Sequence, residues 1–320
     1  MTEPVPFELV NRRGQTVRGV YQRGDGPSGG ERPLVVMSTA FGQTFRKYLS
    51  AAAFFSRNGW DVVRYDITNH PGLSDGNPVD MRLTWMCEDL MDVVDACAAT
   101  EEWPTVAVFA ASLGARVALR ATAEDPRIRA LAMVACVVDA RATMAVANGI
   151  DWFEVWLDSD RTEVDAVRET YGGPMSARCV IDMLEHGWDG IEGTRADLER
   201  IGVPVLDVAG GCDEWVALED VRGVFGAGKA ELVVIDDAVH DLAMGDARMA
   251  MATIVSWFGR VLDVGPALET DVVEPALGAL ARQNRAERHI EKQWATHGSW
   301  DAAPGSVRGL PTHGGAVPLR

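Results

Sequence analysis

The segment TVAVFAASLGAR, residues 105–116, is the most informative part of this sequence for the fold. It begins with a short continuous apolar run, which is typical of a strand buried on both faces. Ser112 follows this run directly, and a helical stretch begins at Leu113. The residues two positions before and after the serine, Ala110 and Gly114, are small, as a tight strand-to-helix turn requires. This layout predicts a nucleophile elbow, in which the turn lifts the serine hydroxyl to the top of a sheet. The alternative is that Ser112 only caps the helix, and the context must decide between the two.

Outward from this stretch, apolar strands alternate with amphipathic helices. We predict strands at 7–10, 16–22, 33–38, 60–65, 105–110, 128–138, 203–208 and 231–235. We predict helices at 48–58, 86–99, 113–123, 217–225, 243–260 and 280–294. The first two strands are expected to form an antiparallel hairpin. The regular alternation of the others predicts an α/β fold, with a mostly parallel sheet flanked by helices on both faces.

The alternation breaks between residues 139 and 199. This segment contains three tryptophans, many acidic residues and no clear strand, so it reads as a mainly helical insertion. It enters after the strand that ends near residue 138, at the carboxyl edge of the sheet, where a cap over a site can form. We therefore predict a core of 1–138 and 200–264, a helical cap of 139–199, and a C-terminal extension of 265–320 that is disordered beyond about residue 300.

Composition excludes several classes of protein. The 320 residues are 47% hydrophobic and 24% charged, which is ordinary for a globular chain. The formal net charge of −17 argues against duplex nucleic acid or an anionic membrane surface as the main partner. No apolar run reaches the ~18 residues of a membrane span, and the N-terminus lacks a signal-peptide pattern. The five cysteines are scattered, which predicts reduced thiols in a cytoplasmic protein. No cluster of residues has metal-ligand spacing, and we expect neither a metal nor a cofactor.

A serine hydroxyl needs a histidine to take its proton and a carboxylate to orient that histidine. In α/β-hydrolases these residues follow the serine in the order acid, then histidine, on loops after late strands. Here Asp213 follows the predicted strand 203–208, and His240 follows the strand 231–235. Both are therefore expected at the same edge of the sheet as Ser112. We predict a catalytic triad of Ser112, Asp213 and His240.

Other polar residues near these positions are weaker candidates. The rival carboxylates are Glu214, Asp236, Asp237 and Asp241. Glu214 lies one residue after Asp213, and the other three flank the histidine. Asp213 is preferred because it comes just past the Gly-Gly turn that ends its strand. His70 is a rival base, but its loop precedes the nucleophile in the chain, so we interpret it as a loop or rim residue.

An oxyanion hole needs two backbone N–H donors. The first is expected at Leu113, where the helix after the serine begins. The second should come from the loop after the strand 33–38, which reads Thr39-Ala40-Phe41-Gly42-Gln43. We assign it to Phe41, with a plain loop holding a buried phenylalanine as the alternative.

Beyond these motifs, the chain resembles a known family. The segments AASLGAR (110–116), RYDITNHPGLSDG (64–76), MLEHGWD (183–189), DEWV (213–216), HDL (240–242) and LETDVVEP (268–275) look like the acyl transferase, or myristoyl-acyl-carrier-protein thioesterase, of bacterial bioluminescence systems. The likeness runs in order over about residues 30–290. It departs at Gly114, where that family has a serine.

The resemblance implies an α/β-hydrolase fold and a serine enzyme that acts on acyl thioesters through an acyl-serine. The resemblance implies a fatty acyl group, whereas the alanine-, valine- and arginine-rich composition would also suit a polyketide or peptidyl acyl chain. The thiol carrier is expected to be an acyl carrier protein or coenzyme A. We expect Trp152, Trp156 and Trp188 in the cap to line an apolar substrate pocket or to pack the cap. A carboxyl-ester or lactone hydrolase with the same triad is one alternative. A catalytically silent binding subunit is another, and a homodimer is left open.

If the donor is an acidic carrier protein, the net charge of this chain would repel it at long range. Basic side chains should then cluster near the entrance of the site. The candidates are Arg46 and Lys47, just after the predicted oxyanion loop, and Arg116 in the elbow helix, for which a buried ion pair is the alternative.

Overall fold

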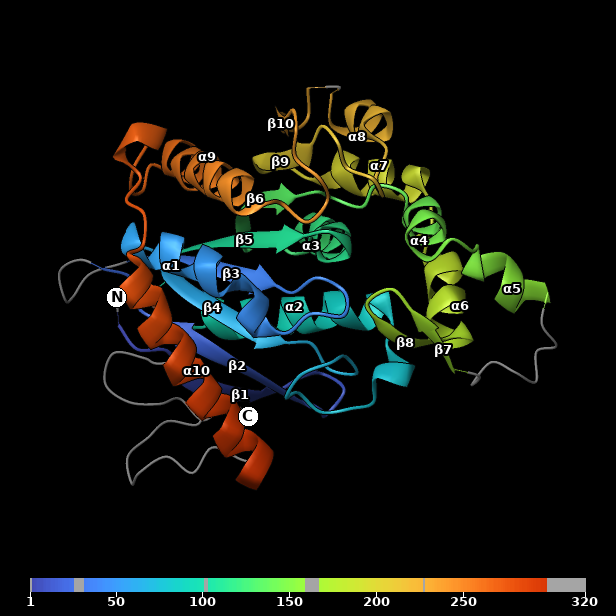
Figure 1. Ribbon diagram of the computed structural model, residues 1–320, viewed down its shortest axis with the longest axis horizontal. Helices are drawn as coiled ribbons and strands as arrows, with labels where there is room; N and C mark the ends of the chain where they lie inside the picture. The colour runs from blue at the N-terminus through green and yellow to red at the C-terminus, as the bar shows by residue number, and fades with distance from the viewer. Residues whose placement is uncertain (1, 26–31, 101–102, 159–166, 227, 298–320) are drawn as a thin grey trace.

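The computed structural model describes residues 2–25, 32–100, 103–158, 167–226 and 228–297. Its centre is an eight-stranded sheet in the order β1-β2-β4-β3-β5-β6-β9-β10 (Figure 1). The strands are β1 (Val5–Val10), β2 (Thr16–Gln22), β3 (Pro33–Ser38), β4 (Asp61–Asp66), β5 (Thr105–Ala111), β6 (Ile128–Val134), β9 (Val205–Gly210) and β10 (Glu231–Ile235). β2 pairs antiparallel with β1 and β4, and the remaining pairs are parallel. The predicted hairpin and mostly parallel sheet are therefore confirmed.

Helices cover both faces of the sheet because alternate residues of each buried strand point to opposite sides. In β3, Leu34 and Val36 pack towards α2 (Leu83–Ala98), α3 (Leu113–Glu124) and α8 (Leu218–Phe225). Val35 and Met37 pack towards α1 (Leu49–Arg57) and α9 (Met244–Leu262) on the other face. This is why the central strands read as continuous apolar runs.

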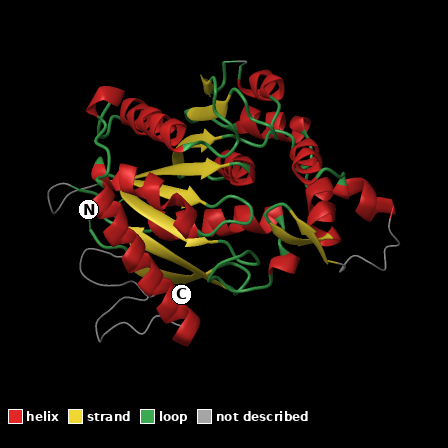
Figure 2. Cartoon of the chain, in the orientation of Figure 1, coloured by secondary structure: helices red, strands yellow, loops and turns green. Residues whose placement is uncertain are grey.

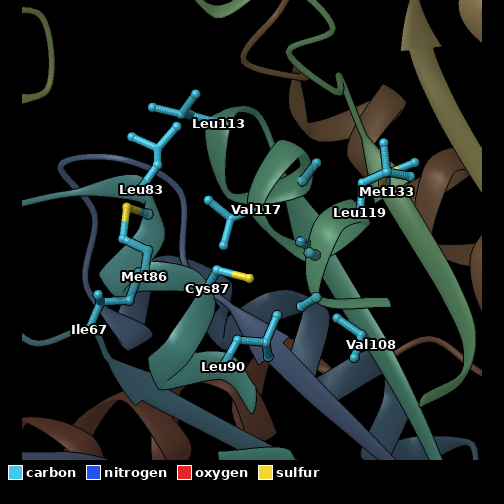
Figure 3. Packing of buried hydrophobic residues seen from close by; sticks show 14 of the residues in the cluster. Ile67, Leu83, Met86, Cys87, Leu90, Val108, Leu113, Val117, Leu119 and Met133 are labelled. Atoms are coloured by element: carbon cyan, nitrogen blue, oxygen red, sulfur yellow. The ribbon is translucent and has the colours of Figure 1, made fainter. Parts of the chain in front are cut away.

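The elbow helix α3 is held against the sheet by an apolar interior. Figure 3 shows Leu113 and Val117 of α3 close to Leu83 and Met86 of α2, all of them buried. Cys87 of α2 lies in the same cluster. The start of α3, directly after Ser112, is thus set by packing that does not depend on the polar residues of the site.

The predicted strand 128–138 ends early, at Val134. Ala135 has a positive φ of 49°, so the chain leaves the sheet there, although Cys136, Val137 and Val138 remain buried. Buried positions are occupied by apolar residues whether or not they pair within the sheet. An apolar run alone therefore does not show where strand pairing stops.

The segment 139–199 contains α4 (Ala140–Asn148), α5 (Trp152–Asp158), α6 (Ala177–Glu185) and α7 (Ile191–Arg200). It also contains an antiparallel hairpin of β7 (Val167–Thr170) and β8 (Gly173–Ser176), visible apart from the main sheet in Figure 2. The expectation of no strand here was wrong. Each strand has only four residues, and Gly172 in the turn and Gly173 at the start of β8 both have positive φ. The sequence of this hairpin therefore resembles that of a loop. α7 packs against α3 rather than standing away from the sheet.

The C-terminal helix α10 (Leu277–His297) includes the predicted helix 280–294. Its Ile290 and Trp294 form a small buried cluster with Val20 of β2 and with Phe45, at the start of the 3₁₀ helix η1 (Phe45–Tyr48). The predicted disorder beyond about residue 300 lies outside the described residues.

No helix in the described ranges is long and apolar enough to cross a membrane. The same ranges hold no group of three or more His, Cys, Asp or Glu side chains placed to bind a metal ion. Of the five cysteines, Cys212 is exposed and the other four are buried, and all five are free thiols.

Candidate active site

Ser112 lies in a strained turn between β5 and α3, with φ 55° and ψ −131°. Its N–H donates to the carbonyl of Val134 at 2.9 Å, which holds the turn against the end of β6. A methyl group on Gly114 would come within 2.5 Å of the carbonyl oxygen of Thr39, so this position requires glycine in the observed arrangement. A non-glycine residue with positive φ costs about 1–3 kcal/mol and persists only where its surroundings enforce it. The elbow predicted from the small flanking residues is therefore present.

The three predicted side chains are in contact. The Oγ of Ser112 lies 2.8 Å from Nε2 of His240, and Nδ1 of His240 lies 2.8 Å from Oδ2 of Asp213. The other oxygen of Asp213 accepts from the N–H groups of Trp215 and Val216, both at 2.9 Å. In this geometry the imidazole can take the serine proton while the carboxylate holds its tautomer.

Asp213 is set up to remain ionised. Burial by itself would raise its pKa, but hydrogen bonds from His240, Val216 and Trp215 outweigh burial and lower the pKa below its ordinary value. A second carboxyl, Asp207 of β9, is fully buried, and burial raises its pKa to about 7. Asp213 is therefore fully ionised at neutral pH, whereas Asp207 keeps its proton to a much higher pH and is only partly ionised there.

The acid and histidine loops are held together by close backbone contacts. A methyl group on Gly210 would lie 2.5 Å from the carbonyl oxygen of Ala238, and one on Gly211 would lie 2.2 Å from that of Asp236. The N–H of Cys212 donates to Ala238 at 2.9 Å. The Gly-Gly turn thus allows the loop of Asp213 to pack on the loop of His240.

Among the rival carboxylates, Glu214 and Asp241 have other contacts. Glu214 accepts from the backbone N–H of His240 at 3.2 Å, so it supports the loop rather than the imidazole. Asp241 pairs with Lys47 at 3.6 Å, and both side chains are well exposed.

The loop after β3 presents one unpaired amide at the predicted position. The N–H of Ala40 donates to the Tyr48 hydroxyl, that of Gly42 to Nε2 of His70, and that of Gln43 to the carbonyl of Ala40. Phe41 lies between them, and among the described residues no acceptor is found for its N–H. The N–H of a residue that begins a helix, as Leu113 does, has no partner within the helix. These two amides are the candidate oxyanion donors.

The tip of the β7–β8 hairpin touches both sides of this site. A methyl group on Gly172 would come within 2.6 Å of the Phe41 ring, so hairpin and loop are in close contact. The ring centres of Tyr171 and Trp215 are 4.4 Å apart, and those of Trp215 and His240 are 4.6 Å apart. Sequence reasoning missed Tyr171 because it recognised no hairpin, and missed Trp215 because nothing distinguished it from its neighbours.

The three tryptophans of the cap have different surroundings. Trp152 and Trp156 of α5 form a pair with ring centres 5.2 Å apart, half-buried and buried respectively. Trp188 is buried under the guanidinium groups of Arg116 and Arg120, at 4.9 and 3.8 Å, and its N–H donates to Thr84. The contacts of Trp188 are those of a residue that packs the insertion onto α2 and α3.

The basic residues considered for carrier docking are mostly engaged. Arg116 is fully buried and pairs with Asp197 at 2.7 Å, so it is not at an entrance. Arg46 pairs with Glu291 of α10 at 2.9 Å. His70 was interpreted as a loop or rim residue. It does lie in the loop after β4, but not at a rim, because the residue is only 3% exposed and its Nε2 accepts from the Gly42 N–H.

Comparison with solved structures shows the fold. Est1E from Butyrivibrio proteoclasticus, with ferulic acid bound, superposes with a TM-score of 0.66 at 16% identity, covering 79% of this chain and 98% of that one. The α/β-hydrolase GrgF from a Penicillium species superposes with a TM-score of 0.62 at 20% identity, over 82% and 100%. The chain has the α/β-hydrolase fold, as predicted.

Sequence comparison defines the family. A family model described as acyl transferase matches residues 28–293, and the chain belongs to that family. The acyl transferase of Vibrio harveyi is 26% identical over 267 residues, 81% of this chain and 85% of that protein. The acyl transferase of Photobacterium phosphoreum is 23% identical over 269 residues, with the same coverage. The resemblance drawn from the motifs is confirmed, and the protein is an enzyme of acyl transfer or hydrolysis.

Proposed function

We propose that this protein is a serine acyltransferase or thioesterase that takes an acyl group from a thioester through an acyl-serine intermediate. The observation that carries the proposal is the continuous hydrogen-bonded chain from Asp213 through His240 to Ser112. Beside it lies the amide of Phe41, which has no acceptor within the part of the chain that the structure describes. A complete chain of this kind is expected of a working nucleophile.

The chemical steps follow from this geometry. The Ser112 oxygen attacks the thioester carbonyl while Nε2 of His240 takes its proton, and Asp213 stabilises the imidazolium. The amides of Phe41 and Leu113 bind the oxygen that becomes negative. The C–S bond then breaks, the thiol leaves with the proton from His240, and the acyl-serine remains. Water or another nucleophile, deprotonated by His240, then attacks the acyl carbonyl. The ester bond to Ser112 breaks, the serine oxygen takes the proton back from His240, and the acyl group leaves on its new acceptor.

The contacts of the hairpin tip with Phe41 and Trp215 support a cap over the serine. Exclusion of water by such a cap would favour transfer over hydrolysis. We assign Trp152 and Trp156, the aromatic pair of α5, to the surface that binds the acyl chain. Trp188 is left out of this assignment because its ring packs on two arginines.

Intact-protein mass spectrometry tests the proposal. The protein is incubated with coenzyme A thioesters of straight chains from butyryl to palmitoyl, and with the same chains on acyl carrier protein. We expect a mass increase of one acyl group that is absent in Ser112→Ala, and a chain-length preference that changes in Trp152→Ala. A fluorophosphonate probe should label the wild type and not Ser112→Ala.

Two results would decide against this assignment. Turnover of p-nitrophenyl esters without any adduct from a thioester would favour the carboxyl-ester or lactone hydrolase. Near wild-type activity in Ser112→Ala would refute the acyl-serine mechanism.

A further inference from the structure

The oxyanion loop is held by side chains that lie outside the triad. Its amides at positions 40 and 42 donate to Tyr48 and His70, at 3.2 and 2.8 Å, and the amide between them, Phe41, is the candidate oxyanion donor. Both acceptors are buried, at 8% and 3% exposure, and come from different parts of the chain. The bond to His70 fixes the peptide plane after Phe41, and the bond to Tyr48 fixes the plane before Ala40. The plane between them carries the Phe41 N–H, and its carbonyl, that of Ala40, accepts from the Gln43 N–H at 3.1 Å.

We infer that His70 is a positioning residue of the oxyanion hole, and that it holds the Phe41 amide in place through the N–H of Gly42. This inference rests on the proposed function, because it assigns a role within that same site. Tyr48 acts in the same way from the other side, through the N–H of Ala40.

The chemistry of the imidazole suits this role. A ring nitrogen accepts a hydrogen bond only when it carries no proton, so the bond from Gly42 requires the neutral tautomer with the proton on Nδ1. Burial lowers the pKa of His70 to about 4, which keeps the ring neutral at neutral pH. The Phe41 ring packs on His70 with centres 5.9 Å apart, so loop and imidazole are also in apolar contact.

The loop that holds His70 is itself braced. Asn69, which has a positive φ of 55°, donates its N–H to the carbonyl of Asp75 at 3.0 Å. Its side-chain oxygen accepts from the N–H of Asn77 and from Gln15, at 3.1 and 3.2 Å. The loop of His70 is therefore closed by its own contacts and joined to Gln15, in the turn between β1 and β2. Through His70 the oxyanion loop is tied to this turn.

Loss of this contact should slow the chemical step and leave substrate binding almost unchanged. The oxyanion contact is strong only in the transition state, so it contributes to kcat and little to KM. Removing one oxyanion donor costs about 10²–10³-fold in kcat, and displacing it by about 1 Å can cost about 10²-fold. We expect His70→Leu, which fills the volume without an acceptor, to reduce kcat about 10- to 100-fold.

A pair of amide variants separates positioning from packing. Glutamine at position 70 places its side-chain oxygen near the location of Nε2, whereas asparagine is one carbon shorter and does not reach the Gly42 amide. His70→Gln should therefore retain most of the wild-type kcat, and His70→Asn should lose as much as His70→Leu. This comparison holds even if His70→Leu does not fold. Tyr48→Phe should show a smaller loss, because its bond to the loop is longer.

The experiment measures kcat and KM for decanoyl coenzyme A and p-nitrophenyl decanoate, with melting temperatures for each variant. His186→Leu is the matched control, because that histidine is half-exposed at the end of α6 and its ring faces Asp182. We expect it to match the wild type in both constants.

The outcomes are distinct. A low kcat with unchanged KM in His70→Asn, and recovery in His70→Gln, supports the inference. Equal kcat in His70→Gln and His70→Asn, or a change in KM alone, overturns the inference about His70. If Ser112→Ala is inactive in the same assay, the proposed function still stands. Wild-type activity in Ser112→Ala overturns the proposed function and this inference together.

Discussion

Breaking the buried ion pair between Arg64 of β4 and Glu287 of α10 by removing one partner should strongly destabilise the protein. Both side chains are fully buried, and the two carboxylate oxygens of Glu287 accept from both terminal nitrogens of Arg64. Glu287 also accepts from Gln283 at 3.0 Å, and Gln283 donates to Gln22 of β2. Breaking a buried pair by removing one partner leaves an uncompensated charge and costs about 3–5 kcal/mol.

Glu287→Gln tests this estimate with little change of shape. The amide oxygen can still accept from one arginine nitrogen, but the amide NH₂ then faces the other donor. Among the described residues, the one further acceptor of Arg64 is the Phe45 carbonyl, at 3.2 Å. We expect the free energy of unfolding to fall by about 3 kcal/mol, the lower end of the range for a broken buried pair. The measurement is urea denaturation followed by tryptophan fluorescence and circular dichroism.

A double variant and a surface control define the result. Arg64→Met with Glu287→Leu removes both charges, and its stability should lie within about 1 kcal/mol of the wild type or exceed it. Glu192→Gln breaks an exposed pair with Arg195 and should cost less than about 1 kcal/mol. If Glu287→Gln costs no more than this control, or if the double variant is as unstable as the sum of its parts, the reasoning is wrong.

Three further predictions concern the site. Asp213→Asn should reduce kcat about 10⁴-fold through the wrong imidazole tautomer; steady-state kinetics within tenfold of the wild type would contradict this role. Asp207 has its pKa raised to about 7 when folded, so its ionisation lowers stability as the pH rises from about 4 to 7. At pH 8 the free energy of unfolding of Asp207→Asn should therefore exceed that of the wild type by about 2–4 kcal/mol, and its melting temperature should be higher. The difference should disappear at pH 4. Equal melting curves at pH 8 would contradict this prediction. Gly114→Ala should push the Thr39 carbonyl away from α3 and reduce kcat about 10- to 100-fold by displacing the oxyanion loop, and an unchanged kcat would show that the loop tolerates the shift.

The sequence alone predicts the sheet, the elbow and the residues that meet there. Buried strands must be apolar, helices must present an apolar stripe, and the small residues around Ser112 reflect steric limits that act within a few positions of the chain. Asp213 and His240 follow from topology, because the carboxyl ends of parallel strands share one edge.

Only the tertiary structure decides which loop residues support these groups. His70 bonds to an amide 28 residues away in the chain, and the hairpin tip at Gly172 meets Phe41 across an even longer separation. Trp188 carries the same apolar signal as Trp152, yet one packs on arginines of α3 and the other pairs with Trp156. Periodicity reports whether a residue is buried, whereas the identity of its neighbour depends on loop paths and on how the insertion packs on the sheet, which no local pattern encodes.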